Sequence, residues 1–236
     1  MPVDFDEVLR FAQLSCDAYS SPDAIVALLG DCFTVAKKND TIEIAIKGTD
    51  TLSQGALNVV TTVFQTVSWF YSKVETHAHV TGLMETADHL QYLNIAHLII
   101  KEVDKMHPSI LGNENCEKYI ICGHSRGGTI AMYCGLLLLQ KGRQVTQIYT
   151  YGAPKLFLNN DVIKTTTEDT IKLWKEQMLH IEHQFDPVPK VSGVTRTALG
   201  SKEVQLVEGH VIKLSNAAPD YHSMVLSYLP GLEEIV

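Results

Sequence analysis

A short apolar segment, a glycine-rich turn and a long apolar segment follow one another between residues 119 and 140, and this succession limits the fold most. Residues 119–122 are apolar and partly β-branched, as in a buried strand. Residues 129–140 are too long and too rich in Leu and Ala for a strand, which predicts a buried helix. The turn between them reads Gly123-His-Ser-Arg-Gly127. The sequence therefore predicts a strand–turn–helix unit with a serine at its apex.

This turn matches the G-x-S-x-G pattern, which predicts a nucleophile at Ser125. Glycines two residues to either side would let the strand and the helix approach without side-chain clash. The helix N-terminus behind Ser125 would offer unpaired N–H groups and a positive dipole to a developing oxyanion. The alternative is a glycine-rich turn with a buried serine, as many doubly wound domains carry.

Composition narrows the classes of partner. The 236 residues are 45% hydrophobic and 19% charged, which suits an ordered chain with a sizeable core. A net charge of −8 argues against nucleic acid and against electrostatic adsorption to anionic membranes, so any lipid contact would be apolar and transient. The five cysteines lack CxxC spacing, and the first residues carry acids where a signal peptide has bases. Both features favour a cytoplasmic protein with reduced thiols.

Strands and helices are expected to alternate along the chain. Further strands are expected at residues 32–36, 41–46, 74–80, 145–151 and 178–184, with a β pair at 204–207 and 211–214. Further helices are expected at residues 8–19, 83–106 and 223–229. This pattern predicts an α/β fold with a mostly parallel central sheet flanked by helices, whose site lies at the carboxyl ends of the strands. Because no linker or repeat interrupts the order, residues 1–236 are expected to form a single domain.

The segment Thr51–Ser72 contains no charged residue and several aromatic ones. It is long enough to span a bilayer, but its scattered Thr, Ser, Gln and Asn residues argue against a transmembrane helix. Two interpretations stay open. The segment is either a core helix followed by the start of a strand, or a lid that presents apolar surface to an acyl chain above Ser125.

A serine nucleophile needs a base to take its proton and an acid to orient that base. In α/β hydrolases both follow the serine in the chain, the acid first. His222 lies at a loop-to-helix junction, from which its side chain could reach over a sheet edge, so we favour it as the base. Asp186 ends a strand between Phe185 and Pro187, and a rigid loop at a strand end positions a side chain well.

Each of these assignments has an alternative. His222 could be an exposed histidine at a helix start, and Asp186 could simply begin an Asp-Pro turn. Asp220 competes for the role of the acid because it is two residues from His222, but we expect it to cap the helix that follows. His77 and His79 have H-x-H spacing without a further ligand nearby, so neither a metal nor an organic cofactor is expected.

Several motifs together resemble the class 3 lipase family, an α/β-hydrolase group that includes fungal triacylglycerol lipases. The motifs are Phe11-Ala with Ala18-Tyr19, Ala45-Ile-Lys-Gly-Thr49, Gly123-His-Ser-Arg-Gly-Gly128, Tyr151-Gly-Ala-Pro-Lys155, Asp186-Pro-Val-Pro189, and His222 with Tyr228. They extend from the first expected helix almost to the C-terminus. The sequence departs from the family pattern at Ile46-Lys47, where Phe-Arg is usual.

The resemblance implies a triad of Ser125, Asp186 and His222, with oxyanion donors at Thr49 and the backbone N–H of Arg126. By itself, the loop that contains Thr49 could equally be an ordinary strand end. The implied activity is that of a serine carboxylic-ester hydrolase of lipase type, which cleaves acyl esters of glycerides or related lipids through an acyl-enzyme. The alternatives are a phospholipase or acyltransferase with the same triad, and a non-catalytic interaction protein on a lipase fold.

Overall fold

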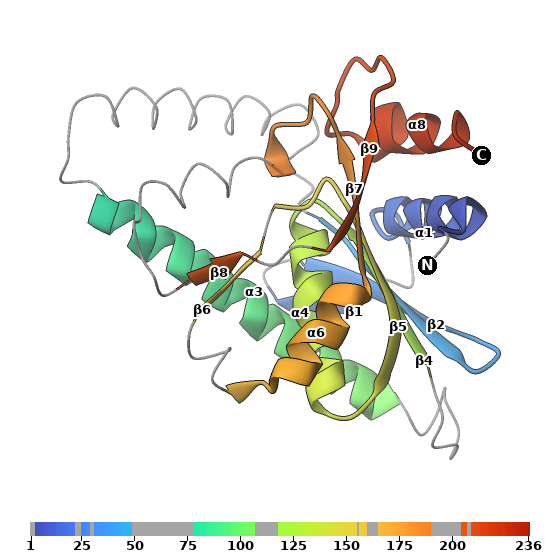
Figure 1. The fold of residues 1–236 in the computed structure, drawn as a ribbon. Helices are drawn as coiled ribbons and strands as arrows, with labels where there is room; N and C mark the ends of the chain where they lie inside the picture. Colours follow the sequence, from blue (N-terminus) through green and yellow to red (C-terminus); the bar gives the residue numbers. More distant parts are fainter. Residues whose placement is uncertain are drawn as a thin grey trace.

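The structure, a computed structural model, describes residues 3–21, 25–28, 31–48, 78–106, 118–154, 156–159, 165–189, 204–206 and 209–236 (Figure 1). Within these residues, a seven-stranded sheet has the order β1-β2-β3-β4-β5-β7-β9. Its strands are β1 (Ile25–Leu28), β2 (Asp31–Lys38), β3 (Thr41–Ile46), β4 (Lys118–His124), β5 (Gln144–Tyr151), β7 (Met178–His183) and β9 (His210–Leu214). Neighbours from β3 to β9 pair in parallel, whereas β1 and β2 form an antiparallel edge. The predicted mostly parallel sheet is confirmed.

Helices cover both faces of this sheet (Figure 1). On one face lie α3 (Ala78–Met106), α4 (Arg126–Gln140) and α6 (Glu168–Glu176), and on the other lie α1 (Phe5–Asp17) and α8 (Leu229–Glu233). Alternate side chains of strand β4 point to opposite faces of the sheet, so this strand contributes to the hydrophobic core on each face. Tyr119 and Ile121 belong to the core under α4, while Ile120 and Cys122 belong to the core under α1.

Helix α4 is apolar around its whole circumference because it packs against β4, β5, α3 and α6. Twelve of its residues, from Gly127 to Leu138, are buried. The indole N–H of Trp174 on α6 donates to the carbonyl oxygen of Met132 at 2.8 Å, which fixes the two helices together. The turn that holds Ser125 is therefore anchored to the most deeply buried helix that the structure describes.

The expected β pair near the C-terminus is wrong. Strand β8 (Val204–Leu206) pairs in antiparallel fashion with β6 (Phe157–Asn159), and β9 joins β7 in parallel. Both segments are short and apolar, and such patterns specify a strand without specifying its partner. The consequence for the site is large, because β9 brings the loop that carries His222 to the carboxyl end of β7.

Two other expectations need correction or lie outside the described residues. The expected strand at residues 74–80 is wrong for 78–80, which begin helix α3. The segment Thr51–Ser72 and the remainder of that strand lie outside the described residues. The closing helix begins as a π-helical turn, η3 (Met224–Tyr228), and continues as α8, which accommodates Pro230 in its first turn. Within the described part of the chain, no helix combines the length and apolarity that crossing a membrane requires.

Candidate active site

Ser125 occupies a sharp turn between the end of β4 and the start of α4. Its backbone has φ 55° and ψ −130°, a conformation that non-glycine residues rarely adopt. The glycines around it are needed for space, since a Cβ on Gly127 would lie 2.8 Å from the carbonyl carbon of Lys47. The backbone N–H of Ser125 donates to the carbonyl oxygen of Tyr151 at 2.9 Å, which ties the turn to the end of β5. The predicted strand–turn–helix unit is present at this position.

The structure brings Ser125, His222 and Asp186 into one buried row. The Oγ of Ser125 is 2.9 Å from Nε2 of His222, and Nδ1 of the same ring is 2.7 Å from Oδ2 of Asp186. The exposed fractions of the three residues are 2%, 3% and 0% in that order. His222 is separated from Ser125 by 97 positions and from Asp186 by 36. The sheet brings the three together because they follow the carboxyl ends of its strands β4, β7 and β9. This geometry allows proton transfer from a serine hydroxyl to an imidazole that a carboxylate orients.

Asp186 lies in a loop after β7, where both carboxylate oxygens accept hydrogen bonds. The backbone N–H of Val188 donates to Oδ1 at 2.8 Å. The hydroxyl of Tyr228 donates to Oδ2 at 2.6 Å and accepts from the backbone N–H of His183 at 3.2 Å. Burial, and then the negative charge of Asp186, raise the pKa of Tyr228, so its hydroxyl remains a donor. A buried carboxylate with these donors is held in a fixed orientation.

Asp220 has a different role from the one that the sequence suggested. Its Oδ1 accepts from the backbone N–H of His222 at 3.0 Å, and the imidazole turns to Asp186 instead. The expectation that Asp220 caps the closing helix is wrong. The cap of η3 is Ser223, whose hydroxyl accepts from the backbone N–H of Leu226 at 3.2 Å. A carboxylate two residues before the histidine reaches the backbone of the loop more easily than the far nitrogen of the ring.

His124, next to Ser125 in the turn, is a site neighbour to which the sequence analysis assigned no role. Its Nε2 is 2.7 Å from the carbonyl oxygen of His222, and its Nδ1 is 2.9 Å from the hydroxyl of Tyr19. The two imidazole rings lie with centroids 4.7 Å apart. Burial, with a smaller contribution from His222, holds the pKa of His124 well below its usual value, so the ring is neutral. Residues 18–19 belonged to a recognised motif, but no local signal pairs Tyr19 with a histidine 105 residues away.

The expected oxyanion donors are only partly described. Arg126 is the first residue of α4, so its backbone N–H lies at the N-terminal end of that helix. Its guanidinium carbon lies 5.3 Å from the ring centroid of Tyr92 on α3, so the side chain extends toward α3. Thr49 lies outside the described residues. The preceding Gly48 is close to the turn, since a Cβ there would lie 3.3 Å from Cβ of Ser125.

The described residues contain no group of three or more His, Cys, Asp or Glu side chains placed to hold a metal ion. Both ring nitrogens of His222 and of His124 are already in hydrogen bonds within the site. The chemistry that these residues can perform by themselves is nucleophilic attack by a hydroxyl with general-base assistance.

Comparison with known proteins identifies a family for this chain. A family model described as lipase (class 3) matches residues 43–196, which include Ser125 and Asp186 but end before His222. No curated protein matches the chain.

Several solved structures share the fold. One is the Lip2 lipase from Yarrowia lipolytica, at 16% identity and TM-score 0.51 over 91% of this chain and 79% of that one. Another is lipase II from Rhizopus niveus, at 17% identity and TM-score 0.52 over 90% and 81%. A third is the Rhizomucor miehei triacylglyceride lipase, at 16% identity and TM-score 0.53 over 89% and 80%. The α/β-hydrolase fold predicted from the sequence is confirmed by these likenesses.

Proposed function

The chain belongs to the class 3 lipase family, and from this premise we propose that it is a serine carboxylic-ester hydrolase acting on glycerides or related lipids. The observation that carries the proposal is the buried row of Ser125, His222 and Asp186, with contacts of 2.9 and 2.7 Å. A fold alone would not carry it, because the same fold can lose its chemistry while it keeps its packing.

In the proposed reaction, Oγ of Ser125 attacks the acyl carbonyl while Nε2 of His222 takes the hydroxyl proton. The imidazolium then gives this proton to the leaving alcohol, and the acyl group remains on Ser125 as an ester. Water attacks that ester with the same base, and the acid is released. Asp186 accepts from Nδ1 of His222 throughout, which leaves Nε2 free to accept the proton of the serine.

The oxyanion of each tetrahedral intermediate needs donors that are in place before the reaction. We assign the backbone N–H of Arg126 to this role because it is at the positive end of α4, directly after the nucleophile. Thr49 is the second proposed donor, and the approach of Gly48 to Ser125 supports that assignment.

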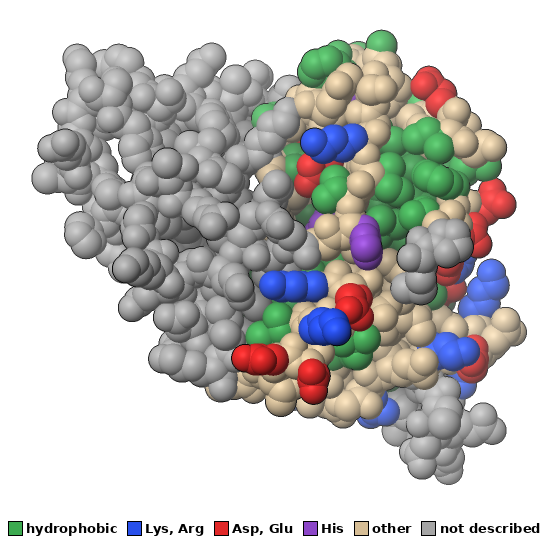
Figure 2. Space-filling view, viewed as in Figure 1, with side chains coloured by type: hydrophobic (Ala, Val, Ile, Leu, Met, Phe, Trp, Pro, Cys, Tyr) green, Lys and Arg blue, Asp and Glu red, His purple; other side chains and the backbone are tan. Residues whose placement is uncertain are grey.

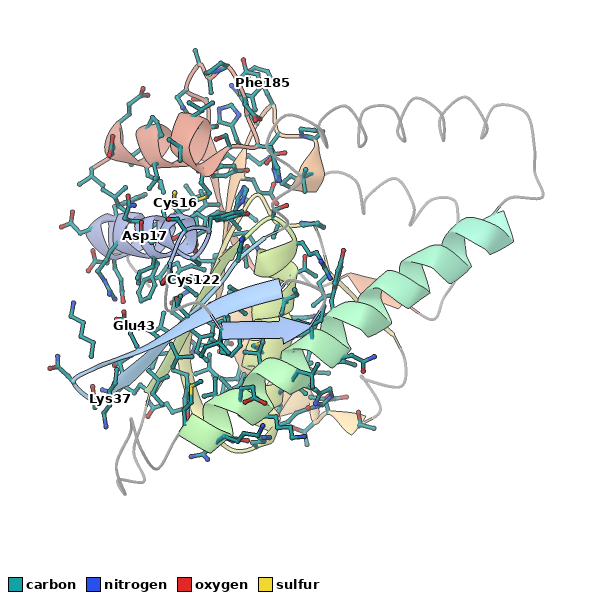
Figure 3. The ribbon with its side chains drawn as sticks, turned by 180° about the vertical axis from the view of Figure 1, so that it is seen from behind. Cys16, Asp17, Lys37, Glu43, Cys122 and Phe185 are labelled. Carbon is teal, nitrogen blue, oxygen red and sulfur yellow. The ribbon has the colours of Figure 1, made fainter. Side chains whose placement is uncertain are left out.

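The described cysteines support the cytoplasmic location that the sequence suggests. Cys16, Cys122 and Cys134 are free thiols, and Cys122 lies beneath α1 in Figure 3. Burial raises the pKa of Cys122 to about 12 and also raises that of Cys134, so neither thiol is a nucleophile at neutral pH. Neither of these two buried thiols competes with Ser125 as the nucleophile to test.

The decisive experiment replaces the nucleophile. We expect Ser125→Ala to abolish both ester hydrolysis and labelling by a fluorophosphonate probe, with a loss of about 10⁴- to 10⁶-fold in rate. The matched control is Ser20→Ala, which changes an exposed serine near the end of α1 and should label and turn over as the wild type does.

A panel of triglyceride, phospholipid and short-chain esters would then separate a glyceride lipase from a phospholipase. Labelling and turnover that survive in Ser125→Ala would overturn the proposal. Absence of both in the folded wild-type protein would favour a non-catalytic interaction protein.

A further inference from the structure

The two ring nitrogens, the backbone N–H and the backbone carbonyl oxygen of His222 all have hydrogen-bond partners. Two of these partners, Asp186 and Ser125, belong to the proposed triad. The ring nitrogens contact Asp186 and Ser125, as described above. The backbone N–H donates to Asp220, and the backbone carbonyl oxygen is 2.7 Å from Nε2 of His124. The position of the proposed base therefore depends on its backbone contacts as well as on its ring contacts.

The contact with His124 fixes the protonation of that ring. A carbonyl oxygen can only accept, so Nε2 of His124 must carry the proton that it donates to His222. The neutral ring then has a bare Nδ1, which accepts from the hydroxyl of Tyr19 at 2.9 Å. Tyr19 thus favours the one tautomer that can hold the loop.

Two adjacent residues of the turn, His124 and Ser125, contact His222 at different atoms. Ser125 contacts the ring of His222 through its side chain, and His124 contacts the carbonyl oxygen of the same residue. Together these two contacts fix the distance between the proposed nucleophile, Ser125, and the proposed base, His222. The ring of His124 is tilted by 36° to that of His222, with the two centroids 4.7 Å apart. Because the His124 ring is neutral, it does not repel the imidazolium that forms during the proposed reaction.

We infer that His124 is a positioning residue for the base of the proposed reaction, and that Tyr19 holds His124 in the tautomer this task requires. The inference rests on the proposed function. The ring nitrogens of His124 contact the backbone carbonyl oxygen of His222 and the hydroxyl of Tyr19, so its effect on the reaction passes through the backbone of His222.

The test measures kcat for each active site rather than for each protein molecule. Sites are counted by complete fluorophosphonate labelling, and kcat and KM are measured on a soluble short-chain ester. We expect His124→Leu to lower kcat per labelled site by about 10- to 100-fold, as a small misplacement of reacting groups does, with little change in KM. His124→Gln should recover most of this loss, because its amide N–H can still reach the carbonyl oxygen of His222.

A second variant keeps the test independent of whether His124→Leu folds. Tyr19→Phe should lower kcat in the same direction, and should cause no further loss when His124 is already Leu, since both changes act through one contact. The matched control is His180→Gln on β7. The Nδ1 of His180 is 2.6 Å from the hydroxyl of Thr150, which is not a member of the row of Ser125, His222 and Asp186. This variant should keep the wild-type kcat.

The outcomes separate this inference from the proposed function. A wild-type protein that neither labels nor hydrolyses esters would overturn both. An active wild type whose kcat per labelled site is unchanged in His124→Leu would overturn the positioning role alone. If His124→Leu does not fold, an unchanged kcat in Tyr19→Phe would have the same effect.

Discussion

Two carboxylates lie near His222, and their surroundings give them different tasks. Asp186 is fully buried, contacts the ring and receives two further hydrogen bonds. Asp220 is half-buried, and its carboxylate accepts from the backbone N–H of His222 instead of contacting the ring. Orientation of the imidazole therefore depends on Asp186, and the shape of the loop depends in part on Asp220.

The first prediction compares the two variants in which Asp186 or Asp220 is replaced by asparagine. Asp186→Asn should lower turnover by about 10⁴-fold, because an amide no longer favours the tautomer in which Nε2 accepts. Asp220→Asn should keep most of the rate, since its amide oxygen can still accept from the backbone N–H. Paired kinetic and melting measurements check this. The reverse pattern would move the orienting role to Asp220.

The second prediction concerns the pH dependence of stability. His124 faces His222, Tyr19 and Tyr228, and burial keeps the pKa of His124 well below 6.5 in the folded protein. The unfolded chain protonates this residue near its ordinary pKa of about 6.5, so below that pH the unfolded state binds more protons. The free energy of unfolding should therefore fall as the pH drops below about 6.5, by up to about 1.4 kcal/mol per pH unit from this residue.

Urea denaturation of the wild type and of His124→Gln between pH 7 and 5 isolates this contribution. The variant should show a shallower fall, while all other histidines contribute equally to both proteins. Identical slopes would mean that His124 is protonated in the folded state.

At the scale of elements, the turn between β4 and α4 holds its serine in a strained backbone conformation. The φ of 55° at Ser125 is stabilised by the packing of β4, α4 and the glycines between them. Such strain is on the order of 1–3 kcal/mol for a non-glycine residue and is common at functional sites. The orientation of Oγ toward His222 is a consequence of that conformation.

The third prediction follows from this strain. Ser125→Gly should unfold with a free energy about 1 kcal/mol higher than that of Ser125→Ala, because glycine adopts positive φ readily and alanine does not. Both variants lack the hydroxyl, so the comparison isolates the backbone. Chemical denaturation at one pH measures the difference. If alanine were the more stable of the two, the turn would not be strained.

The turn at Ser125 was also the part of the fold most easily predicted from the sequence, because the strand, the glycines and the helix that form it are adjacent in the chain. The partner of β9 was not readable, since its short apolar pattern suits either an antiparallel neighbour or β7. The same limit applied to the site. Asp186 and His222 carried local signals, whereas the pairing of Tyr19 with His124 joins residues 105 positions apart and forms only in the folded chain.

At the scale of the whole molecule, both core layers are needed to form the site. The core under α4 anchors Ser125, while η3 packs with the core under α1 and presents Tyr228 to Asp186. We propose that residues 1–236 act as one domain on this ground, because neither layer could hold the row of Ser125, His222 and Asp186 without the other.

The final prediction concerns adsorption to lipid. Phe185, next to Asp186, is 56% exposed, and Leu226 in η3 is 47% exposed. Figure 3 shows Phe185 at the outer edge of the molecule, and Figure 2 shows further hydrophobic side chains over the region of α8 and α1. With a net charge of −8, attraction to lipid must come from such apolar contacts. Binding to phosphatidylcholine vesicles should therefore be the same at low and high salt.

Phe185→Ser and Leu226→Ser should each weaken that binding by about tenfold, which corresponds to ~1.4 kcal/mol and is close to the value for burying one large apolar side chain. Leu173→Ser is the matched control, because Leu173 is 40% exposed on α6, on the opposite face of the sheet from η3. Co-sedimentation with vesicles measures all three variants. An equal loss in Leu173→Ser would show that the apolar contact is not localised near Asp186, and a strong salt dependence would show that charge governs adsorption.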